Sequence, residues 1–402
     1  MALMPVADAL QAVLDGVVAL PVESVTLDDA FHRTLAHDVV ALRTQPPADM
    51  SAMDGYAVRA ADASLNAKLK VIGEVAAGKP FGRKVGANEA VRIFTGGVVP
   101  DGADTIVIQE DAEASGDTVT IKEAARPNRH IRKAGIDFRE GDVLIPKGTR
   151  LSDRDLALAA SANHPHLAVH KRPKVAVLAT GDELVMPGST TGPGQIVYSN
   201  GYALRALARH AGAEVIDLGI AADTMEATTA AIRRARELNA DVLVTTGGAS
   251  VGDHDLVKHA LESEGTQMAF WHIAMRPGKP MMSGKLKTMR VLGVPGNPVS
   301  SYVCSFLFLV PLIRALSGNA ACDHAVESAL LGRDLAANDM RQDYLRARLD
   351  TDSTGTLRAT PVDHQDSSLM ANLAKADALI IRPPDAPAAR KGASVSILRL
   401  PA

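Results

Sequence analysis

Acidic side chains follow three apolar segments, each at a small-residue turn where a predicted strand ends. ATGDELVMPG places Asp182 and Glu183 directly after the first segment, and GIAADTMEA places Asp223 in the matching position after the second. VTTGGASVGDHD follows the third and carries Ser250 and Asp255. A glycine turn after a strand ordinarily receives phosphate through its backbone N–H groups. The carboxylates therefore indicate a site for a cation as well as an anion.

Each of these acids also has a purely structural interpretation. Asp223 suits a helix N-cap, and Asp182 suits a turn in which the side chain bonds its own backbone. Because acidic residues recur in all three loops, a functional role is favoured over both of these structural interpretations. The carboxyl ends of parallel strands meet at one edge of a sheet, and ligands bind there.

Positive charge follows soon after the third loop. MRPGKP places Arg276 and Lys279 around a Pro-Gly turn, and GVPGNPVSS offers backbone N–H groups and hydroxyls before a helix. A phosphate-bearing ligand with Mg²⁺ fits this set, because Mg²⁺ uses one or two carboxylates together with waters and phosphate oxygens. A solvated basic turn is an equally good account of MRPGKP on charge alone.

Several familiar sites are excluded by pattern. The sequence has no GxxxxGK[ST] or GxGxxG loop at these turns and, among 12 histidines and 2 cysteines, no HExxH or Cys-x-x-Cys. Nucleotide loops of those types and tight zinc sites are therefore not expected. His254, between two acids, is a candidate base, although a lone histidine is more often inert.

The chain is long enough for several domains, with 402 residues. Val6, Leu10, Val13 and Leu14 share one face of a predicted N-terminal helix. Glycine-punctuated strands then fill 45–133, which reads as an inserted all-β domain. Residues 134–172 return to a strand and a helix that starts with a capping box at Ser152. We expect 1–44 and 134–172 to form one discontinuous mixed domain in which the two helices pack together.

Residues 173–318 alternate strand and helix. VAVLA, EVIDLGI and DVLVT are the predicted strands, and Asn200 is the predicted cap of the helix that ends near Gly212. This alternation indicates a doubly wound α/β domain with parallel strands. Residues 319–402 hold short strands parted by polar turns, which indicates a C-terminal β domain like a small barrel.

Composition indicates a cytoplasmic protein without nucleic-acid or membrane partners. The formal net charge is −3, and Cys304 and Cys322 form no disulfide framework. MALMPVADALQAVLDGV lacks the basic start of a signal peptide. YVCSFLFLVPLIRAL is shorter than the roughly 18 to 20 apolar residues of a membrane span, and it contains Pro311 and Arg314.

The segment PPADMSAMDGYAVRAAD is dense in small residues around Met53, Asp54 and Tyr56. A binding loop and a mobile hairpin share this composition, so both interpretations stay open.

Seven motifs in order resemble those of the molybdopterin molybdenumtransferase family, and the chain is also similar to the E domain of gephyrin. They are SAMDGYA, TGGVVPDGADTIVIQED, GIDFREGD, ATGDEL, GGASVGDHD, MRPGKP and GVPGNPVS, and the resemblance covers about the whole chain. It implies four domains, an elongated homodimer, and an active site between the α/β domain of one subunit and the inserted β domain of the other.

The resemblance also implies roles for particular residues. The implied catalytic residues are Asp54, Thr95, Asp137, Glu183, Asp223 and Asp255. The implied contacts to the pterin nucleotide are Thr180, Gly181, Asp182, Gly247, Gly248, Ser250, Pro277, Gly278, Pro295, Gly296 and Asn297. The implied molybdate contacts are Arg276, Lys279, Pro280, Arg341, Ser367 and Ser368, and the implied Mg²⁺ ligands are Glu183, Asp223 and Asp255.

The implied reaction inserts molybdate into adenylylated molybdopterin and releases AMP. Transient contact with the molybdopterin adenylyltransferase is implied as well. Two alternatives stay open. The chain is itself a molybdopterin adenylyltransferase, or it is a non-catalytic dimeric scaffold. Two positions depart from the commonest pattern: Arg276 stands where many relatives have lysine, and His272 stands where relatives often have lysine. Asp253 and His254 receive no role.

Overall fold

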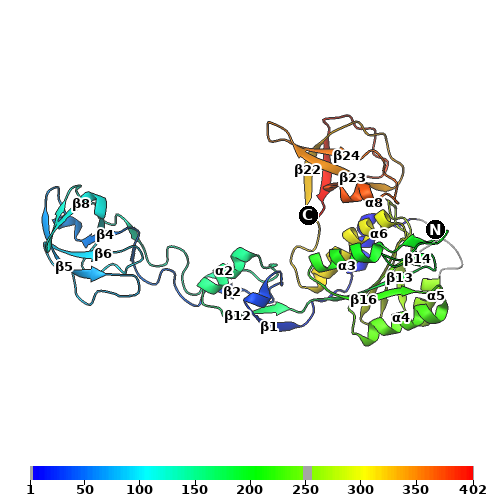
Figure 1. Cartoon of the computed structure of the whole chain (residues 1–402), viewed down its shortest axis with the longest axis horizontal. Coiled ribbons are helices and arrows are strands. Elements are labelled where there is room, and N and C mark those ends of the chain that lie inside the picture. Colours follow the sequence, from blue (N-terminus) through cyan, green and yellow to red (C-terminus); the bar gives the residue numbers. More distant parts are fainter. Residues whose placement is uncertain (1–2, 248–255, 402) are drawn as a thin grey trace.

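The computed structural model describes residues 3–247 and 256–401, which form an elongated chain (Figure 1). A β domain lies at one end, a slender module with one helix lies in the middle, and an α/β domain and a C-terminal β domain lie together at the other end. The chain starts in the α/β half, runs out to the β domain and returns. The predicted fold class, with an all-β domain inserted by two passes of chain, is confirmed.

The outgoing and returning passes pair with each other along the arm. In the middle module the antiparallel pairs are β1 (Val22–Thr26) with β12 (His166–His170) and β2 (Val39–Val40) with β11 (Val143–Ile145). A third antiparallel pair, β3 (Met50–Ser51) with β10 (Ile131–Arg132), lies against the β domain. The helix α2 (Asp153–Ser161) has the predicted capping box, because the Asp155 N–H donates to the Ser152 hydroxyl and the Ser152 N–H donates to the Asp155 carboxylate.

The inserted β domain is one six-stranded sheet in the order β7-β4-β6-β5-β9-β8. Its strands are β4 (Gly55–Val58), β5 (Lys68–Val75), β6 (Glu89–Ile93), β7 (Thr105–Ile108), β8 (Ala112–Ser115) and β9 (Thr118–Ile121). All four residues of β4 are buried between β6 and β7. The β4 part of the segment around Tyr56 therefore packs inside a sheet, whereas the two interpretations of the part around Met53, which is 41% exposed, stay predictions.

The α/β domain has a six-stranded sheet in the order β16-β13-β17-β21-β20-β18. Its strands are β13 (Lys174–Thr180), β16 (Glu214–Ala221), β17 (Val242–Thr246), β18 (Gln267–Phe270), β20 (Met282–Leu286) and β21 (Met289–Val294). The three predicted strands β13, β16 and β17 are parallel, as is β21, while β18 and β20 form an antiparallel edge. Two short strands, β14 (Leu184–Val185) and β15 (Ile196–Val197), pair in the loop after β13.

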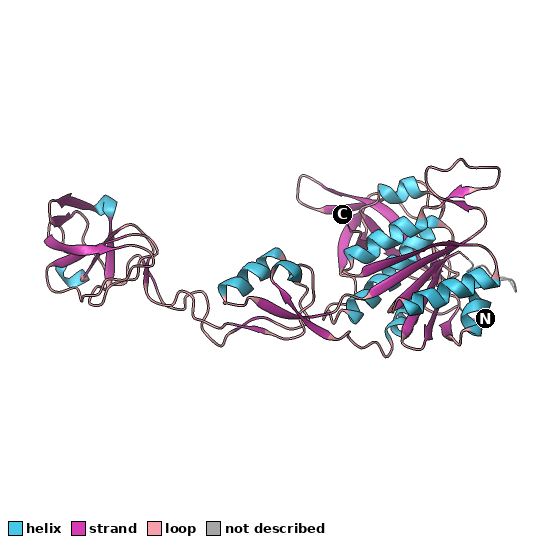
Figure 2. Cartoon of the chain, turned by 60° about the horizontal axis from the view of Figure 1, so that its bottom comes forward, coloured by secondary structure: helices cyan, strands magenta, loops and turns pink. Residues whose placement is uncertain are grey.

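Alternate residues of β13 face opposite sides of this sheet, as the period of a strand requires. Val175 and Val177 join the core that contains α3 (Asn200–His210) and the helix over 298–316. Ala176 and Leu178 join the core that contains α4 (Met225–Glu237) and α5 (Leu256–Ser263). Helices therefore cover both faces, as Figure 2 shows, and the doubly wound prediction is confirmed.

One continuous helix of 19 residues crosses the α/β core. It consists of α6 (Pro298–Cys304), a π-helical turn (Ser305–Leu309) and α7 (Val310–Leu316). Pro311 has no N–H to donate, and only Val310 separates it from the π turn, a common form of interruption in a helical hydrogen-bond ladder. The helix is longer than the sequence suggested and has the length and apolar composition of a membrane span, but 83% of its 18-residue apolar window is buried in this structure. It is packed as a core helix.

The helix α1 (Val6–Leu14) forms where the apolar spacing predicted it, with Ala9 and Val13 buried. These side chains join the α/β core beside α7 and β18. The middle module has a separate core around Leu35 and Val169. The expectation that α1 packs with α2 is therefore wrong, because the apolar face of α1 is covered by the α/β domain.

The C-terminal domain is a closed barrel. Its strands are β22 (Val326–Leu331), β23 (Gln342–Thr351), β24 (Leu357–Pro361), β25 (Ala378–Arg382) and β26 (Ser394–Arg399). The order β23-β24-β22-β26-β25 closes because β25 pairs again with β23. β19 (Met275–Arg276) pairs with β23 and connects the barrel to the α/β domain, and α8 (Met370–Ala374) lies near α6. The barrel-like prediction is confirmed.

Candidate active site

A cleft of about 690 Å³ opens at the C-terminal ends of β13, β17 and β21. It lies between the α/β domain and one loop of the C-terminal domain, where ligands of doubly wound sheets bind. Eight of the predicted site residues line it: Thr180, Glu183, Gly247, Pro280, Pro295, Gly296, Asn297 and Ser368. Gly181 and Asp182 lie between the lining residues Thr180 and Glu183 without lining the cleft themselves, and Pro277 and Gly278 precede the lining residue Pro280 by three and two positions.

Two helices begin at this cleft. α3 starts at Asn200 and α6 at Pro298, and neither Ser199 nor Asn297 caps its helix with a side-chain hydrogen bond. The first N–H groups of a helix have no partner inside the helix, and they bind oxyanions well. The cleft therefore offers two such helix starts to a phosphate-bearing ligand.

The side chain of Asn200 connects the loops around the cleft. Its amide donates to the Thr246 hydroxyl (3.0 Å) and to the Gly296 carbonyl (2.7 Å). The expectation that Asn200 caps α3 is wrong, because the helix already includes it and its side chain is used across the cleft. The ends of β17 and β21 are thereby held against the start of α3.

Gly247 is the first residue of the loop after β17, and only glycine suits its position. Its φ is +92°, and an added Cβ would lie 2.4 Å from the carbonyl oxygen of Thr180. The backbone of this loop therefore passes directly against the end of β13.

The acids of the first two loops are linked to each other. The Asp182 N–H donates to the Asp223 carboxylate (3.3 Å), and the Asp223 N–H donates to the Asp182 carboxylate (3.1 Å). The structural interpretation of Asp223 as an N-cap is wrong, because Thr224 caps α4 through its hydroxyl. Glu183 is exposed and lines the cleft. Two carboxylates thus meet beside the cleft with a third next to them in the chain.

The third acidic loop lies outside the described residues. This applies to Gly248, Ser250, Asp253, His254 and Asp255, so the opening motif GGASVGDHD is placed only through Gly247. Within residues 3–247 and 256–401, no group of three His, Cys, Asp or Glu side chains is placed to hold a metal ion. The predicted ligand set stays a prediction.

The predicted cations fall into two kinds. Arg276 donates to Asp343 twice (3.0 and 2.6 Å), and Arg341 donates to Asp339 in the same way (3.1 and 2.6 Å). Hydrogen bonds from Arg341 hold the pKa of the Asp339 carboxyl well below its usual range. Neither arginine is among the lining residues of the cleft. Their role toward molybdate stays a prediction.

Lys279 differs from both arginines. Its ammonium is exposed and has no hydrogen-bond or ion-pair partner in the described part of the chain, and it is adjacent to Pro280 of the cleft. Burial and then the charge of Lys279 lower the pKa of His272, so this histidine is neutral at pH 7. Of the three predicted cations, Lys279 is therefore the one that has no partner within the described residues, and it is next to the cleft in the chain.

The two predicted serines lie on a loop of the barrel. Asn297 donates to the Ser367 hydroxyl (3.1 Å), and the Ser368 hydroxyl donates to Asp366 (2.6 Å). Arg346, which the sequence analysis missed, is 1% exposed and donates to the carbonyl of Asp366 (3.0 Å) and the side chain of Gln365 (3.1 Å). The signal available in the sequence was an arginine inside the predicted C-terminal strand YLRARL. Arg346 holds the loop that carries Ser367 and Ser368 in place.

Tyr198 is a second lining residue that the sequence analysis missed. Its ring is 1% exposed, its hydroxyl has no hydrogen-bond partner in the described structure, and burial raises its pKa. The hydroxyl lies over Gly201, where an added Cβ would be only 1.6 Å away. The first turn of α3 therefore accommodates the phenol only because residue 201 has no side chain.

Gly201→Ala is expected to lower the free energy of unfolding by about 1–3 kcal/mol, because the new methyl group displaces the Tyr198 ring. Urea unfolding of the two proteins measures the difference. In a Tyr198→Ala background the same substitution should have little effect, since the clashing ring is gone. An equal loss in both backgrounds would mean that the glycine serves another purpose.

The predicted residues of the β domain are far from this cleft within one chain. The Thr95 N–H and hydroxyl donate to Asp54 (2.7 and 2.8 Å), so these two residues form one small site just before β4. Asp137 is exposed between β10 and β11 of the middle module. Figure 1 places β4 and β13 at opposite ends of the molecule. A single chain therefore does not bring these residues together with Glu183.

Thr95→Val is expected to raise the pKa of Asp54 part of the way to its ordinary value. The backbone and side-chain hydrogen bonds from Thr95 lower this pKa, and the substitution removes only the hydroxyl. The lowered pKa means that the ionised, hydrogen-bonded form persists above it and is lost as pH falls through it. Carbon-13 NMR titration of aspartate-labelled protein measures the change, and Thr118→Val provides a control because that hydroxyl bonds Asp117 instead.

The fold and the cleft define a multidomain α/β protein with a cleft at the ends of parallel strands, where two helix starts offer N–H groups to an anion. Three family descriptions match the chain in order: the MoeA N-terminal region (domain I and II) over residues 4–163, the probable molybdopterin binding domain over 176–315, and the MoeA C-terminal region (domain IV) over 328–400.

Curated relatives agree with these matches. The chain is 37% identical to the molybdopterin molybdenumtransferase of Haemophilus influenzae over 89% of each chain, and 34% identical to that of Bacillus subtilis over 98% of this chain and 94% of the relative. A crystal structure of a molybdopterin biosynthesis MoeA protein from Pyrococcus horikosii superposes with a TM-score of 0.83 at 32% identity, covering all of both chains. The protein belongs to the molybdopterin molybdenumtransferase family.

Proposed function

We propose that this chain inserts molybdate into adenylylated molybdopterin and releases AMP, which yields the molybdenum cofactor. The observation that carries the proposal is the cleft, where two uncapped helix starts, the acidic strand-end loops and the serines of the barrel meet. Phosphate oxygens suit the helix starts, and a second oxyanion suits the lysine and hydroxyl side.

The pterin nucleotide binds along the strand ends in this proposal. Its phosphates lie at the first N–H groups of α3 and α6, beside Gly247. Ile196 and Val197 are 56% and 45% exposed and line the cleft, so they offer apolar surface to a planar ring. The fixed geometry of Asn200 keeps these loops in place without the ligand. Binding then brings the reacting groups together, which supplies much of the rate.

Molybdate is the second substrate and binds on the side of the barrel loop. Lys279 attracts it, and Ser367, whose hydroxyl only accepts from Asn297, donates to one of its oxygens. Ser368 donates to molybdate in place of Asp366, to which its hydroxyl donates in the free protein. The protein has to place two anions that repel each other within bonding reach. Positive charge and hydroxyl donors at this end of the cleft reduce that repulsion.

Mg²⁺ fits the donor chemistry of the cleft. The residues that would hold it are Glu183, Asp223 and Asp255, and Mg²⁺ needs only one or two carboxylates when phosphate oxygens and waters complete its shell. The mutual hydrogen bonds of Asp182 and Asp223, which hold these two carboxylates next to Glu183 of the cleft, support this choice. When bound, the ion would draw charge from the phosphate link and make AMP a better leaving group.

The active site is shared between two subunits in this proposal. Asp54 and Thr95 lie at the far end of the elongated chain from Glu183 (Figure 1). In a homodimer with the chains side by side, the β domain of one subunit covers the cleft of the other. Asp54, Thr95 and Asp137 then act on substrate bound to the partner.

Two alternatives are less well supported. An adenylyltransferase does not need the barrel serines or the inserted β domain, and a non-catalytic scaffold does not need acids in the strand-end loops. We further propose that the protein works in the cytoplasm and receives its substrate by transient contact with the adenylyltransferase. Neither nucleic acid nor membrane is proposed as a partner.

Incubation with adenylylated molybdopterin tests the proposal. Purified protein is expected to release AMP when molybdate is added and little without it, and Glu183→Gln should lower that release by about 100-fold. Glu237→Gln, an exposed change on α4, is the matched control. Formation of adenylylated molybdopterin from molybdopterin and ATP would instead support the adenylyltransferase, and inactivity in both incubations would support the scaffold.

A further inference from the structure

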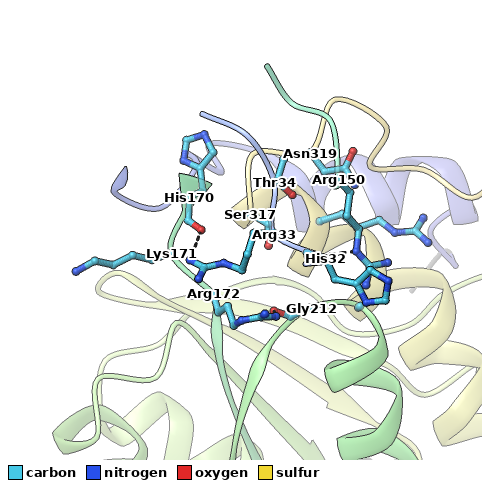
Figure 3. Close-up of a pocket in the computed structure, with 12 residues that line it drawn as sticks. His32, Arg33, Thr34, Arg150, His170, Lys171, Arg172, Gly212, Ser317 and Asn319 are labelled. Atoms are coloured by element: carbon cyan, nitrogen blue, oxygen red, sulfur yellow. Dashed lines mark hydrogen bonds between the residues drawn. The ribbon is translucent and has the colours of Figure 1, made fainter. Parts of the chain in front are cut away.

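A second, much smaller cavity lies where the middle module meets the α/β domain (Figure 3). Four arginines line it: Arg33, Arg150, Arg172 and Arg314. None of its described lining residues is Asp or Glu. The volume of the cavity is about 10 Å³, which leaves room for a single small occupant.

Backbone carbonyls, and not carboxylates, hold three of these guanidinium groups. Arg150 donates to the carbonyl of His210 (2.8 Å), and Arg172 donates to that of Gly212 (3.4 Å), both just beyond or at the end of α3. Arg314 donates to the carbonyl of Asp323 (3.0 Å). A guanidinium has five N–H donors, so each of these groups keeps donors to spare.

The positive charge of the four arginines exceeds the negative charge of their ion-pair partners. Only Arg33 pairs with a carboxylate, that of Glu23, and in the described structure no carboxylate lies within 4.0 Å of Arg150, Arg172 or Arg314. The partial negative charge at the end of α3 offsets part of one positive charge at most. Three partly buried guanidinium groups therefore share one small cavity without counter-ions from side chains.

The directions of the pKa shifts around the cavity agree with a positive potential there. Burial, followed by the charges of Arg314 and Arg172, lowers the pKa of Arg150. Burial, followed by nearby positive charge, also lowers the pKa values of His32 and His210. Burial and the charge of Arg33 lower the pKa of Arg172, and they outweigh Glu214 and Glu23, which act to raise it.

We propose that this cavity is a binding site for a small inorganic anion of the size of chloride. The anion accepts the spare N–H donors of Arg150, Arg172 and Arg314 and supplies the negative charge that the side chains do not. Because the arginines come from both the middle module and the helix α7, the bound anion joins the two parts. It thereby helps to fix the direction of the arm that carries the β domain, independently of the reaction in the cleft.

Thermal unfolding in chloride and in gluconate tests the site. At constant pH and ionic strength, 150 mM chloride is expected to raise the Tm by roughly 2–4 °C over gluconate, which is too large for the cavity. Arg150→Gln and Arg172→Gln should each remove this difference. Arg290→Gln should keep it, because Arg290 is also partly buried and bonded to a carbonyl, that of Asp15, but lies outside the cavity.

Bromide provides a direct measurement that does not depend on the variants. A bromide-soaked crystal of the wild-type protein is expected to show an anomalous peak among the three guanidinium groups. Equal Tm values in chloride and gluconate together with no bromide peak would overturn the proposal. Stabilisation by phosphate in place of chloride would overturn the assigned size of the anion.

Discussion

A hybrid dimer with Asp54→Ala in one subunit and Glu183→Ala in the other is expected to keep about half of the wild-type AMP release. Each variant alone should lose about 100-fold or more. In the hybrid, the cleft of the first subunit is intact and is covered by the intact β domain of the second. The other site has lost both groups. Two affinity tags allow the hybrid to be purified for the AMP assay.

The reverse arrangement is the control for this experiment. In this second hybrid, one subunit carries both Asp54→Ala and Glu183→Ala and the other is wild type. Each shared site then lacks one of the two groups, so almost no AMP release is expected. If each subunit instead worked with its own β domain, the first hybrid would release almost no AMP and the second would keep about half of the wild-type release. This pair of measurements therefore decides between a shared and a self-contained site, and circular dichroism confirms that every hybrid is folded.

The elements of the α/β domain could be predicted because their signals are local. Buried strands such as β13 are continuous apolar runs, and the strand-end acids Asp182 and Asp223 stand out by position. Their link to each other could not be predicted, since it depends on the distance between two loops 41 residues apart in sequence. The same holds for Asn200, whose residue type favours a cap but whose side chain has better partners across the cleft.

Contacts between residues far apart in the sequence also limited what could be predicted in other parts of the chain. The strands of the C-terminal domain were readable one by one, but closure depends on β25 returning to β23. Arg276 was assigned to an anion from the charge of its turn, whereas its partner Asp343 lies 67 residues away and is 3% exposed. The buried face of α1 was predicted correctly, but the domain that covers it was not. Amphipathicity shows that a helix is covered without showing what covers it.

Lys279→Met is expected to lower kcat/KM for molybdate by about 100-fold, mainly through a higher KM. Of the three predicted cations, this is the one without a carboxylate partner in the described structure, because Arg276 and Arg341 donate to Asp343 and Asp339. A cation already paired has less charge to offer a substrate oxyanion. Steady-state AMP release at varied molybdate concentration measures the effect.

Two further variants make this result specific. Lys285→Met, an exposed change on β20, should leave kcat/KM unaltered, and Lys279→Arg should retain part of it because the charge remains. His272 is neutral at pH 7 and so does not replace the lost charge. If Lys279→Met changes kcat/KM less than twofold while Arg341→Met lowers it strongly, molybdate binds at the arginines. Their carboxylate partners would then have to release them when substrate arrives.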